Sequence, residues 1–227
     1  MENNLNYPIN EIFATLQGEA TFTGTPSVFI RLQGCEVGCG WCDTKHTWKL
    51  DVANQVSFIQ ISQKTQDKNN WADTSLDELM TYIQDNYPQI THIVITGGEP
   101  AQYNLTALCE KLEQLGKDVQ IETSGTELLR ITPNTWVTLS PKIDMSGGKI
   151  VLQDAVKYAN EIKMPIGKKS DIEKLKQFLL EFKIPSNTPI WLQPLSQSQG
   201  ATQLCIEEAM LNNWRLSIQV HKYLNIR

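Results

Sequence analysis

Three cysteines, Cys35, Cys39 and Cys42, lie within eight residues of one another in the segment GCEVGCGWC. Thiolates spaced as C-x3-C-x2-C can converge on one inorganic centre, and the glycines between them allow the backbone to wrap closely around it. A 4Fe-4S cluster has four irons, each of which needs a ligand. Three protein thiolates therefore leave one iron open, which suits the binding and reduction of a substrate or cofactor better than plain electron transfer.

Two other interpretations of these cysteines remain open. His46 follows Cys42 by four residues, so the spacing C-x3-C-x2-C-x3-H also fits a Cys3His zinc site. The thiols could instead be reduced and bind nothing. Of the five cysteines in the chain, Cys109 and Cys205 fall in helix-like stretches, where we expect buried small apolar side chains. Outside a zinc site we expect His46 and His92 to be structural.

The composition of the chain excludes several classes of protein. Its 227 residues are 41% hydrophobic and 20% charged, which predicts one medium-sized globular domain. The net charge of −5 argues against a non-specific nucleic-acid binder, and no polybasic patch suggests a membrane surface. No apolar run approaches the roughly 18 residues that span a membrane, and the first residues lack the pattern of a secretion signal. We therefore expect a cytoplasmic protein with a small-molecule partner, without a disulfide framework, nucleic acid or membrane.

Short apolar segments rich in β-branched residues predict strands that are buried on both faces. They lie at 27–32, 92–96, 119–123, 135–140, 189–194 and 215–220. Helical patterns separate most of them, at 75–86, 105–115, 152–162, 170–183 and 200–212. This alternation predicts an α/β fold of parallel strand–helix units. About six strands are too few for a closed eight-fold barrel, which leaves an incomplete barrel or a doubly wound sheet.

Residues 49–74 interrupt this alternation. The segment is mostly polar with a weak apolar cluster at 56–61, and we interpret it as an insertion that carries one short helix. The apolar cluster could dock a partner, although a variable surface loop is the simpler interpretation. No internal repeat or linker marks a boundary, so we expect residues 1–227 to form a single domain.

A second motif, Thr96-Gly97-Gly98-Glu99-Pro100, closes the predicted strand at 92–96. Glycines at a strand end allow another backbone or a ligand to approach closely, and barrel enzymes hold their sites at strand ends. By itself this segment is also typical of a tight turn between strand and helix. Together with the cysteine motif, it resembles the radical S-adenosylmethionine (SAM) superfamily. In that superfamily the open iron chelates the methionyl amino and carboxylate groups of SAM, and the GGEP segment hydrogen-bonds the amino group.

Within that superfamily, the resemblance extends over nearly the whole chain to the 7-carboxy-7-deazaguanine synthase family of queuosine and 7-deazapurine biosynthesis. The segments that carry it are LQGE at 16–19, FIRLQGC at 29–35, WCDTKHTW at 41–48, TGGEP at 96–100, IETSGT at 121–126, SPK at 140–142 and HKYLNIR at 221–227. The resemblance implies an incomplete TIM-like β/α barrel of about six parallel strands, in one radical SAM domain. It also implies a homodimer.

The resemblance implies a carbon–nitrogen lyase reaction. An electron enters the 4Fe-4S cluster and cleaves SAM to methionine and a 5′-deoxyadenosyl radical, which removes a hydrogen atom from C6 of 6-carboxy-5,6,7,8-tetrahydropterin. The ring contracts, ammonia leaves, 7-carboxy-7-deazaguanine forms, and SAM is regenerated. The implied cofactors are the 4Fe-4S cluster, SAM and Mg2+, and the electron donor is left unidentified.

The resemblance also assigns roles to individual residues. The metal ligands are Cys35, Cys39 and Cys42 for the cluster and Thr44 for Mg2+. The SAM-binding residues are Gly98, Glu99, Ser140, Pro141, Lys142 and Gln193, with Glu122 assigned to the ribose. The substrate-binding residues are Leu16, Gln17, Gly18, Glu19, Arg31, Thr96, His221 and Arg227. No catalytic residue is implied beyond the cluster and SAM.

The chemistry of several side chains fits these roles. A hydroxyl oxygen at Thr44 suits Mg2+, which completes its shell with water and substrate oxygens, although a threonine here could also cap a helix. Arg31 lies among apolar residues and needs an anionic partner, either the substrate carboxylate or a protein carboxylate. Gln17 and Glu19 can accept hydrogen bonds from the amide and amino edge of a pterin. A lone histidine such as His221 is otherwise more often structural.

Two alternatives belong to different functional classes. A radical SAM activase, which places a glycyl radical on a partner protein, shares both motifs but would need a protein substrate and consume SAM. A zinc-stabilised binding module would have no redox role. Analysis for iron and sulfide separates the zinc module from both enzymes.

Overall fold

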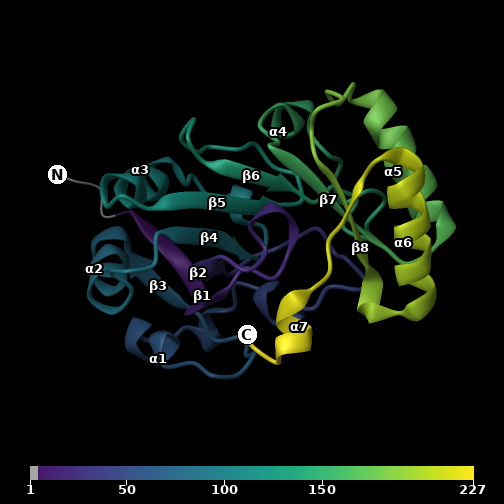
Figure 1. Cartoon of the computed structure of the whole chain (residues 1–227). Coiled ribbons are helices and arrows are strands. Elements are labelled where there is room, and N and C mark those ends of the chain that lie inside the picture. The colour runs from purple at the N-terminus through teal and green to yellow at the C-terminus, as the bar shows by residue number, and fades with distance from the viewer. Residues whose placement is uncertain (1–4) are drawn as a thin grey trace.

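The computed structural model describes residues 5–227, and its strands form one nine-stranded sheet in the order β3-β1-β2-β4-β5-β6-β7-β8-β9 (Figure 1). The parallel strands are β2 (Pro26–Leu32), β4 (His92–Gly97), β5 (Asp118–Thr123), β6 (Trp136–Leu139), β7 (Glu161–Ile166), β8 (Ile190–Pro194) and β9 (Arg215–Leu216). On the other side of β2, β1 (Asn6–Leu16) pairs antiparallel with β2 and with β3 (Ala72–Ser75).

The strand order decides between the two predicted architectures. From β2 to β9 each parallel strand pairs with the next parallel strand along the chain. A doubly wound sheet would reverse its order at a switch point, whereas winding in one direction brings the crossover helices to one face. The incomplete β/α barrel is therefore confirmed. It has seven parallel strands where the sequence predicts about six.

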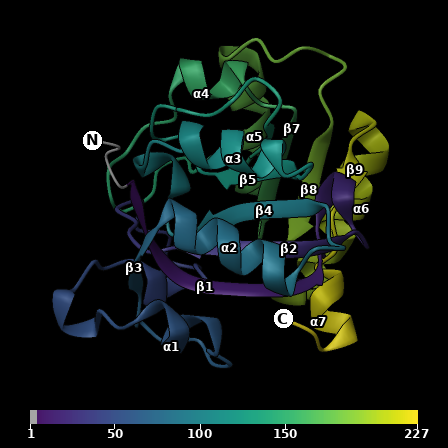
Figure 2. The same cartoon turned by 90° about the vertical axis from the view of Figure 1, so that its left-hand side faces the viewer.

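The helices lie outside the curved sheet. Their bounds are α1 (Phe58–Ser62), α2 (Leu76–Asn86), α3 (Thr106–Gln114), α4 (Gln153–Lys157), α5 (Lys169–Glu181), α6 (Gln199–Asn212) and α7 (Val220–Leu224). Figures 1 and 2 show α2 and α3 outside β4 and β5, while α5 and α6 lie outside β7 and β8. Short 3-10 turns occur at η1 (Ala20–Phe22), η2 (Lys45–Thr47), η3 (Val52–Asn54), η4 (Pro100–Gln102) and η5 (Leu195–Gln197).

Local sequence explains where the best-predicted helices begin and end. The Ser75 hydroxyl accepts a hydrogen bond from the Glu78 amide at 3.2 Å, so it caps the first turn of α2. After α3, Gly116 takes a φ of +70°, the left-handed conformation that ends a helix without a steric penalty.

The sequence prediction missed three strands and gave the wrong extent for one helix and one strand. β1, β3 and β7 were not predicted, and the helix predicted at 152–162 ends at Lys157, before β7 begins at Glu161. The strand predicted at 215–220 is limited to the two residues of β9. Both β1 and β7 carry buried charged side chains, which interrupt the apolar pattern of a buried strand.

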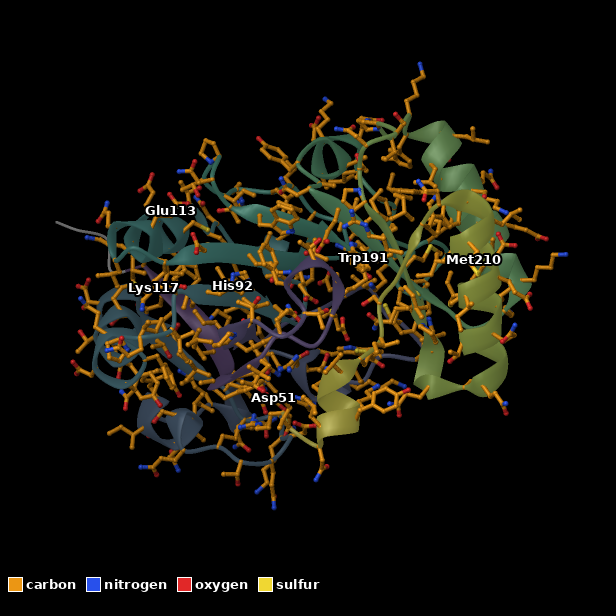
Figure 3. All side chains as sticks on the ribbon, in the orientation of Figure 1. Asp51, His92, Glu113, Lys117, Trp191 and Met210 are labelled. Atoms are coloured by element: carbon orange, nitrogen blue, oxygen red, sulfur yellow. The ribbon has the colours of Figure 1, made fainter. Side chains whose placement is uncertain are left out.

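The core forms two clusters of buried apolar side chains. One lies between β1–β5 and α1–α3, and the other between β6–β8, α5 and α6. Cys109 and Cys205 are fully buried in these clusters, which confirms their prediction as small apolar residues. Figure 3 shows His92 within the body of the sheet and Met210 on the outer helix α6. Within residues 5–227, no helix has the length and apolar character needed to cross a membrane.

Candidate functional site

One cavity lies at the carboxyl ends of the parallel strands, where successive β/α units of a barrel converge. Residues at or just beyond the ends of β2, β4, β5, β6 and β8 line it, and the loop after β1 forms a further wall. Every residue that the sequence assigned to the site lines this cavity except Pro141. Pro141 follows β6 between Ser140 and Lys142, which both reach the cavity.

The cysteine loop follows β2 and turns sharply at two glycines. Gly34 has a φ of +104° and Gly38 a φ of +73°, conformations that other residues adopt only with strain. The amide of Cys35 donates to the carbonyl of Trp48 at 3.0 Å, and the Ser146 hydroxyl donates to the carbonyl of Gly38 at 2.6 Å. Hydrogen bonds from two other loops therefore hold the loop in place around its thiols.

The three thiols fit an iron–sulfur cluster better than a zinc ion. Thiolates around tetrahedral zinc lie about 3.8 Å apart, given a zinc–sulfur bond of about 2.3 Å. Within residues 5–227, the only group of three ligand atoms within 4.8 Å of one another comes from Glu11, His46 and Asp67, and it includes no cysteine. A four-iron cluster places each thiolate on a different iron, which requires a wider spacing. His46 therefore does not complete a Cys3His site.

The chemistry of the thiols is consistent with metal ligation. All three are free, and Cys39 is buried while Cys35 and Cys42 are half-buried. Burial raises the pKa of Cys35 to about 11 and also raises that of Cys39. A buried thiol becomes a thiolate ligand when a bound cation compensates its charge, so the cavity favours thiolates only with a metal centre in place.

The glycine-rich loop after β4 packs directly on the cysteine loop. The Gly98 amide donates to the Leu32 carbonyl at 2.9 Å, and the Glu99 amide donates to the Gly34 carbonyl at 2.8 Å. A Cβ on Gly98 would lie 2.0 Å from the Gly34 carbonyl oxygen, so this position accepts no side chain. This close contact explains why the motif has glycine at position 98. The hydrogen bonds fix the glycine-rich loop relative to the cysteine loop.

The Glu99 carboxylate is occupied by protein partners. It is buried and accepts hydrogen bonds from the amides of Ala101 and Ser124 and from the Thr123 hydroxyl, at 2.6 to 3.0 Å. It therefore braces the end of β4 against the end of β5. Any contact of Glu99 with a ligand uses its backbone or the remaining lone pairs of its carboxylate.

The Thr44 hydroxyl is not used as a helix cap. Thr44 occupies the N-cap position of η2, but its side chain makes no capping hydrogen bond. Its hydroxyl lies 3.5 Å from the Cys42 sulfur, and Thr44 lines the cavity. The capping interpretation is therefore wrong, and the hydroxyl is available to a ligand or ion.

The floor of the cavity holds a charged group that the motifs did not predict. Lys163, on β7, is only 5% exposed and forms ion pairs with Glu19 and with Glu122, the latter at 2.9 Å. Burial alone would raise the pKa of Glu19, but attraction and hydrogen bonding by Lys163, together with the Gln219 amide, lower it to about 2. Burial would lower the pKa of Lys163, but the two carboxylates raise it. Both Glu19 and Lys163 are therefore charged at neutral pH.

Amide side chains complete this floor. Gln193 and Gln219 each donate to Glu19, at 3.2 and 2.9 Å. Gln17 donates to Glu122 at 3.1 Å and accepts from the Glu19 amide at 3.1 Å, so both ends of its side chain have protein partners. Lys163 and Gln219 were missed because their partners lie far away in the sequence. The only local signal for Lys163 is a lysine inside the segment EIKMPI.

The C-terminal segment covers one side of the cavity. The Val220 amide donates to the Gly18 carbonyl at 3.0 Å, and a Cβ on Gly18 would lie 2.3 Å from the His221 ring. Burial lowers the pKa of His221 more than the nearby Glu19 raises it, so the ring is neutral at pH 7. The Arg31 side chain pairs with Glu11 at 3.0 Å, which is the protein carboxylate considered for it, and Arg31 also lines the cavity.

Comparison with known proteins agrees with this geometry. Residues 29–144 match the model of the Radical SAM superfamily, and the chain belongs to this superfamily. It is 52% identical to 7-carboxy-7-deazaguanine synthase of Escherichia coli (strain K12), over 98% of this chain and 100% of that protein. It is 48% identical to the synthase of Buchnera aphidicola subsp. Schizaphis graminum, over 97% of this chain and 99% of that protein. Within the superfamily, the chain therefore belongs to the 7-carboxy-7-deazaguanine synthase family.

A solved structure supports the same assignment. The crystal structure of QueE from Escherichia coli matches with a TM-score of 0.92 at 51% sequence identity, over 95% of each chain. The family predicted from the motifs is confirmed. None of these findings favours the activase or the zinc module.

Proposed function

We propose that this chain is a radical SAM lyase that converts 6-carboxy-5,6,7,8-tetrahydropterin to 7-carboxy-7-deazaguanine and ammonia, in queuosine biosynthesis. The main support for the proposal is that one cavity is lined by the cysteine loop, by the GGEP loop and by the charged side chains of Glu19, Glu122 and Lys163. The proposed enzyme is a single radical SAM domain that works as a homodimer with a separate electron donor. Identity of 52% over nearly the full length supports the assignment.

The cysteine side of the cavity would hold the cofactors. Cys35, Cys39 and Cys42 would bind the 4Fe-4S cluster, and SAM would lie against the residues at the ends of β4, β6 and β8, which are Gly98, Glu99, Ser140, Lys142 and Gln193. When bound, the cluster and SAM supply the radical that abstracts hydrogen. The Lys142 ammonium donates to the Ser140 carbonyl at 2.9 Å and lies 5.3 Å from the centre of the Trp41 ring. These contacts hold the Lys142 side chain in place on the SAM side of the cavity.

The opposite side would hold the pterin. Glu19 is kept ionised by Lys163, so it can accept hydrogen bonds from the amide and amino edge of the ring. Arg31 and Thr44 line the cavity on another side. The Arg31 guanidinium suits the substrate carboxylate, which would also bind Mg2+ held at Thr44. The carboxylate would thus be held at one end and the amino edge at the other.

The chain end would help to exclude water from the reaction. The Thr15 hydroxyl donates to the Arg227 carbonyl oxygen at 2.8 Å, and the Val220 amide at the start of α7 donates to the Gly18 carbonyl at 3.0 Å. Shielding a reactive radical from solvent prevents side reactions.

Anaerobic turnover tests the proposal. The protein is reconstituted with iron and sulfide and mixed with SAM, Mg2+, a chemical reductant and 6-carboxy-5,6,7,8-tetrahydropterin. We expect a product whose mass corresponds to loss of ammonia, formed by wild type and Cys109→Ala but not by Cys35→Ala. An unchanged pterin with accumulation of 5′-deoxyadenosine would contradict the proposed substrate, and a protein that binds only zinc would contradict the reaction class.

A further inference from the structure

A buried carboxylate behind the cavity joins two arginines that line it. Glu11, on β1, is 2% exposed, and it is not among the residues that line the cavity. Its Oε2 accepts from Arg31 Nε at 3.0 Å, and its Oε1 accepts from Arg227 Nη2 at 3.1 Å. One carboxylate therefore fixes two side chains that come from opposite ends of the chain.

Both arginines are also held by an aromatic wall. The guanidinium of Arg227 lies 4.3 Å from the centre of the Phe13 ring, and that of Arg31 lies 5.8 Å from it. Phe13 in turn stacks on Phe29, with ring centres 5.5 Å apart. Both rings line the cavity, so the guanidinium groups are oriented within its wall and not left to move in solvent.

The pairing with Glu11 leaves donors free for a ligand. Arg31 uses only Nε, and its two terminal nitrogens have no protein hydrogen-bond partner within residues 5–227. Two guanidinium groups share the Glu11 carboxylate, so neither has this carboxylate to itself. A fork of free N–H groups on a guanidinium is suited to a planar carboxylate.

The same environment argues against a cation at this place. Glu11, His46 and Asp67 bring ligand atoms within 4.8 Å of one another. However, both oxygens of Glu11 already accept from guanidinium groups, and these positive charges would repel a metal ion. Glu11 is therefore explained by the arginines and not by a metal.

The insertion takes part in this arrangement. Arg227 Nη1 donates to the Lys64 carbonyl at 2.8 Å. The Lys64 ammonium in turn donates to the Asn10 side chain at 2.9 Å and to the carbonyls of Lys68 and Asn70 at 2.6 and 3.1 Å. The 64–70 turn of the insertion is thus fastened to β1, and it supports the chain end at the mouth of the cavity.

We propose that Glu11 is a positioning residue that holds Arg31 and Arg227 as a receptor for the substrate carboxylate, and so sets the preference for carboxylated pterins. The inference rests on the proposed function. Glu11 acts through the arginines and does not touch the substrate.

The test compares two pterins on the reconstituted enzyme with SAM. The probes are 6-carboxy-5,6,7,8-tetrahydropterin and 6-hydroxymethyl-5,6,7,8-tetrahydropterin, which lacks the carboxylate, and both dissociation constants are measured by anaerobic equilibrium dialysis. In Glu11→Gln, we expect affinity for the carboxylated pterin to fall about 10- to 100-fold, since hydrogen bonds to charged groups are worth about one to two powers of ten. Affinity for the hydroxymethyl pterin should change less than about threefold, and KM should rise more than kcat falls.

Two further variants separate a role of Glu11 in binding the carboxylate from a general loss of structure. Glu207→Gln makes the same substitution on the exposed face of α6 and should change neither affinity. Deletion of Arg227 removes one of the two guanidinium groups without changing the core. It should also lower the preference for the carboxylated pterin. When it is combined with Glu11→Gln, the loss of preference should be smaller than the sum of the two single losses. The inference would be overturned if Glu11→Gln lost affinity equally for both pterins, or if it kept the wild-type preference for the carboxylated pterin. A wild-type enzyme with no preference for the carboxylated pterin would overturn the proposed function as well.

Discussion

Replacing Lys163 by methionine removes the cation between the two carboxylates on the cavity floor. Methionine keeps most of the length of the side chain but leaves the Glu19 and Glu122 side chains, which are only 13% and 18% exposed, without this ion partner. Removing one member of a buried ion pair is more damaging than removing a surface pair, because the remaining charge keeps its desolvation penalty. We therefore expect Lys163→Met to lower the free energy of unfolding strongly.

The pKa of Glu19 gives the magnitude of this effect. It is lowered from its ordinary value of 4.5 to about 2, since Lys163 overcomes the effect of burial. That difference corresponds to about 3 kcal/mol at neutral pH, at about 1.4 kcal/mol per pKa unit. This value agrees with the loss of about 3–5 kcal/mol that is typical when one partner of a buried ion pair is removed. For a chain of this size, the melting temperature should fall by about 10 °C.

The effect should depend on pH in a definite direction. Because the pKa of Glu19 is lower in the folded state, its stabilisation is fully present above about pH 4.5 and is lost as the pH falls toward 2. In Lys163→Met, burial raises the pKa of Glu19, and the buried carboxyl becomes neutral more readily in acid. The stability difference between wild type and variant should therefore be largest at neutral pH and shrink toward pH 3.

Urea unfolding of the cluster-free protein, followed by circular dichroism at pH 7 and pH 3.5, measures this difference. Lys174→Met serves as the control, because Lys174 pairs with Asp144 at the surface, where the two side chains are 40% and 70% exposed. An exposed pair contributes about 1 kcal/mol or less. Equal losses of stability in both variants at pH 7, or a loss in Lys163→Met that persists unchanged in acid, would refute this reasoning.

Further predictions concern the cysteine loop, the glycine loop and the ion site. Cys35→Ala should lose the iron and the visible absorption of the reconstituted protein, whereas Cys109→Ala should keep both. Gly98→Ala places a Cβ 2.0 Å from a backbone oxygen of Gly34, so SAM affinity should fall at least about tenfold in equilibrium dialysis. Thr44→Val should abolish the stimulation of turnover by Mg2+ without changing iron content. Unchanged SAM affinity in Gly98→Ala, or undiminished Mg2+ stimulation in Thr44→Val, would contradict the roles assigned to these loops.

Elements whose structure is decided by residues close together in the sequence could be predicted. The strands β4 and β5 are short, rich in β-branched residues and mostly buried, so their apolar runs identify them. The cap at Ser75 and the glycine after α3 mark helix ends through local hydrogen bonds and backbone conformation. The motif residues could be predicted to meet because the carboxyl ends of parallel strands converge.

Two of the three missed strands, β1 and β7, carry buried charged residues. β1 holds Glu11, and β7 holds Glu161 and Lys163, all buried. A charged residue interrupts an apolar pattern, and it is tolerated here because its partner comes from a distant part of the chain. Lys163 and Glu19 are separated by 144 positions, and Arg227 and Glu11 by 216. No local pattern contains such pairs, so neither the strands nor the pairs could be predicted.

Hydrogen abstraction from C6 of the carboxylated pterin, with SAM regenerated, is the step that defines the proposed reaction. The most direct measurement uses substrate deuterated at C6 and follows SAM, 5′-deoxyadenosine and the pterin by mass spectrometry during anaerobic turnover. We expect deuterium to enter SAM while the pterin loses ammonia and the amount of SAM stays nearly constant. Unlabelled SAM beside a deuterated, unconverted pterin would contradict this expectation.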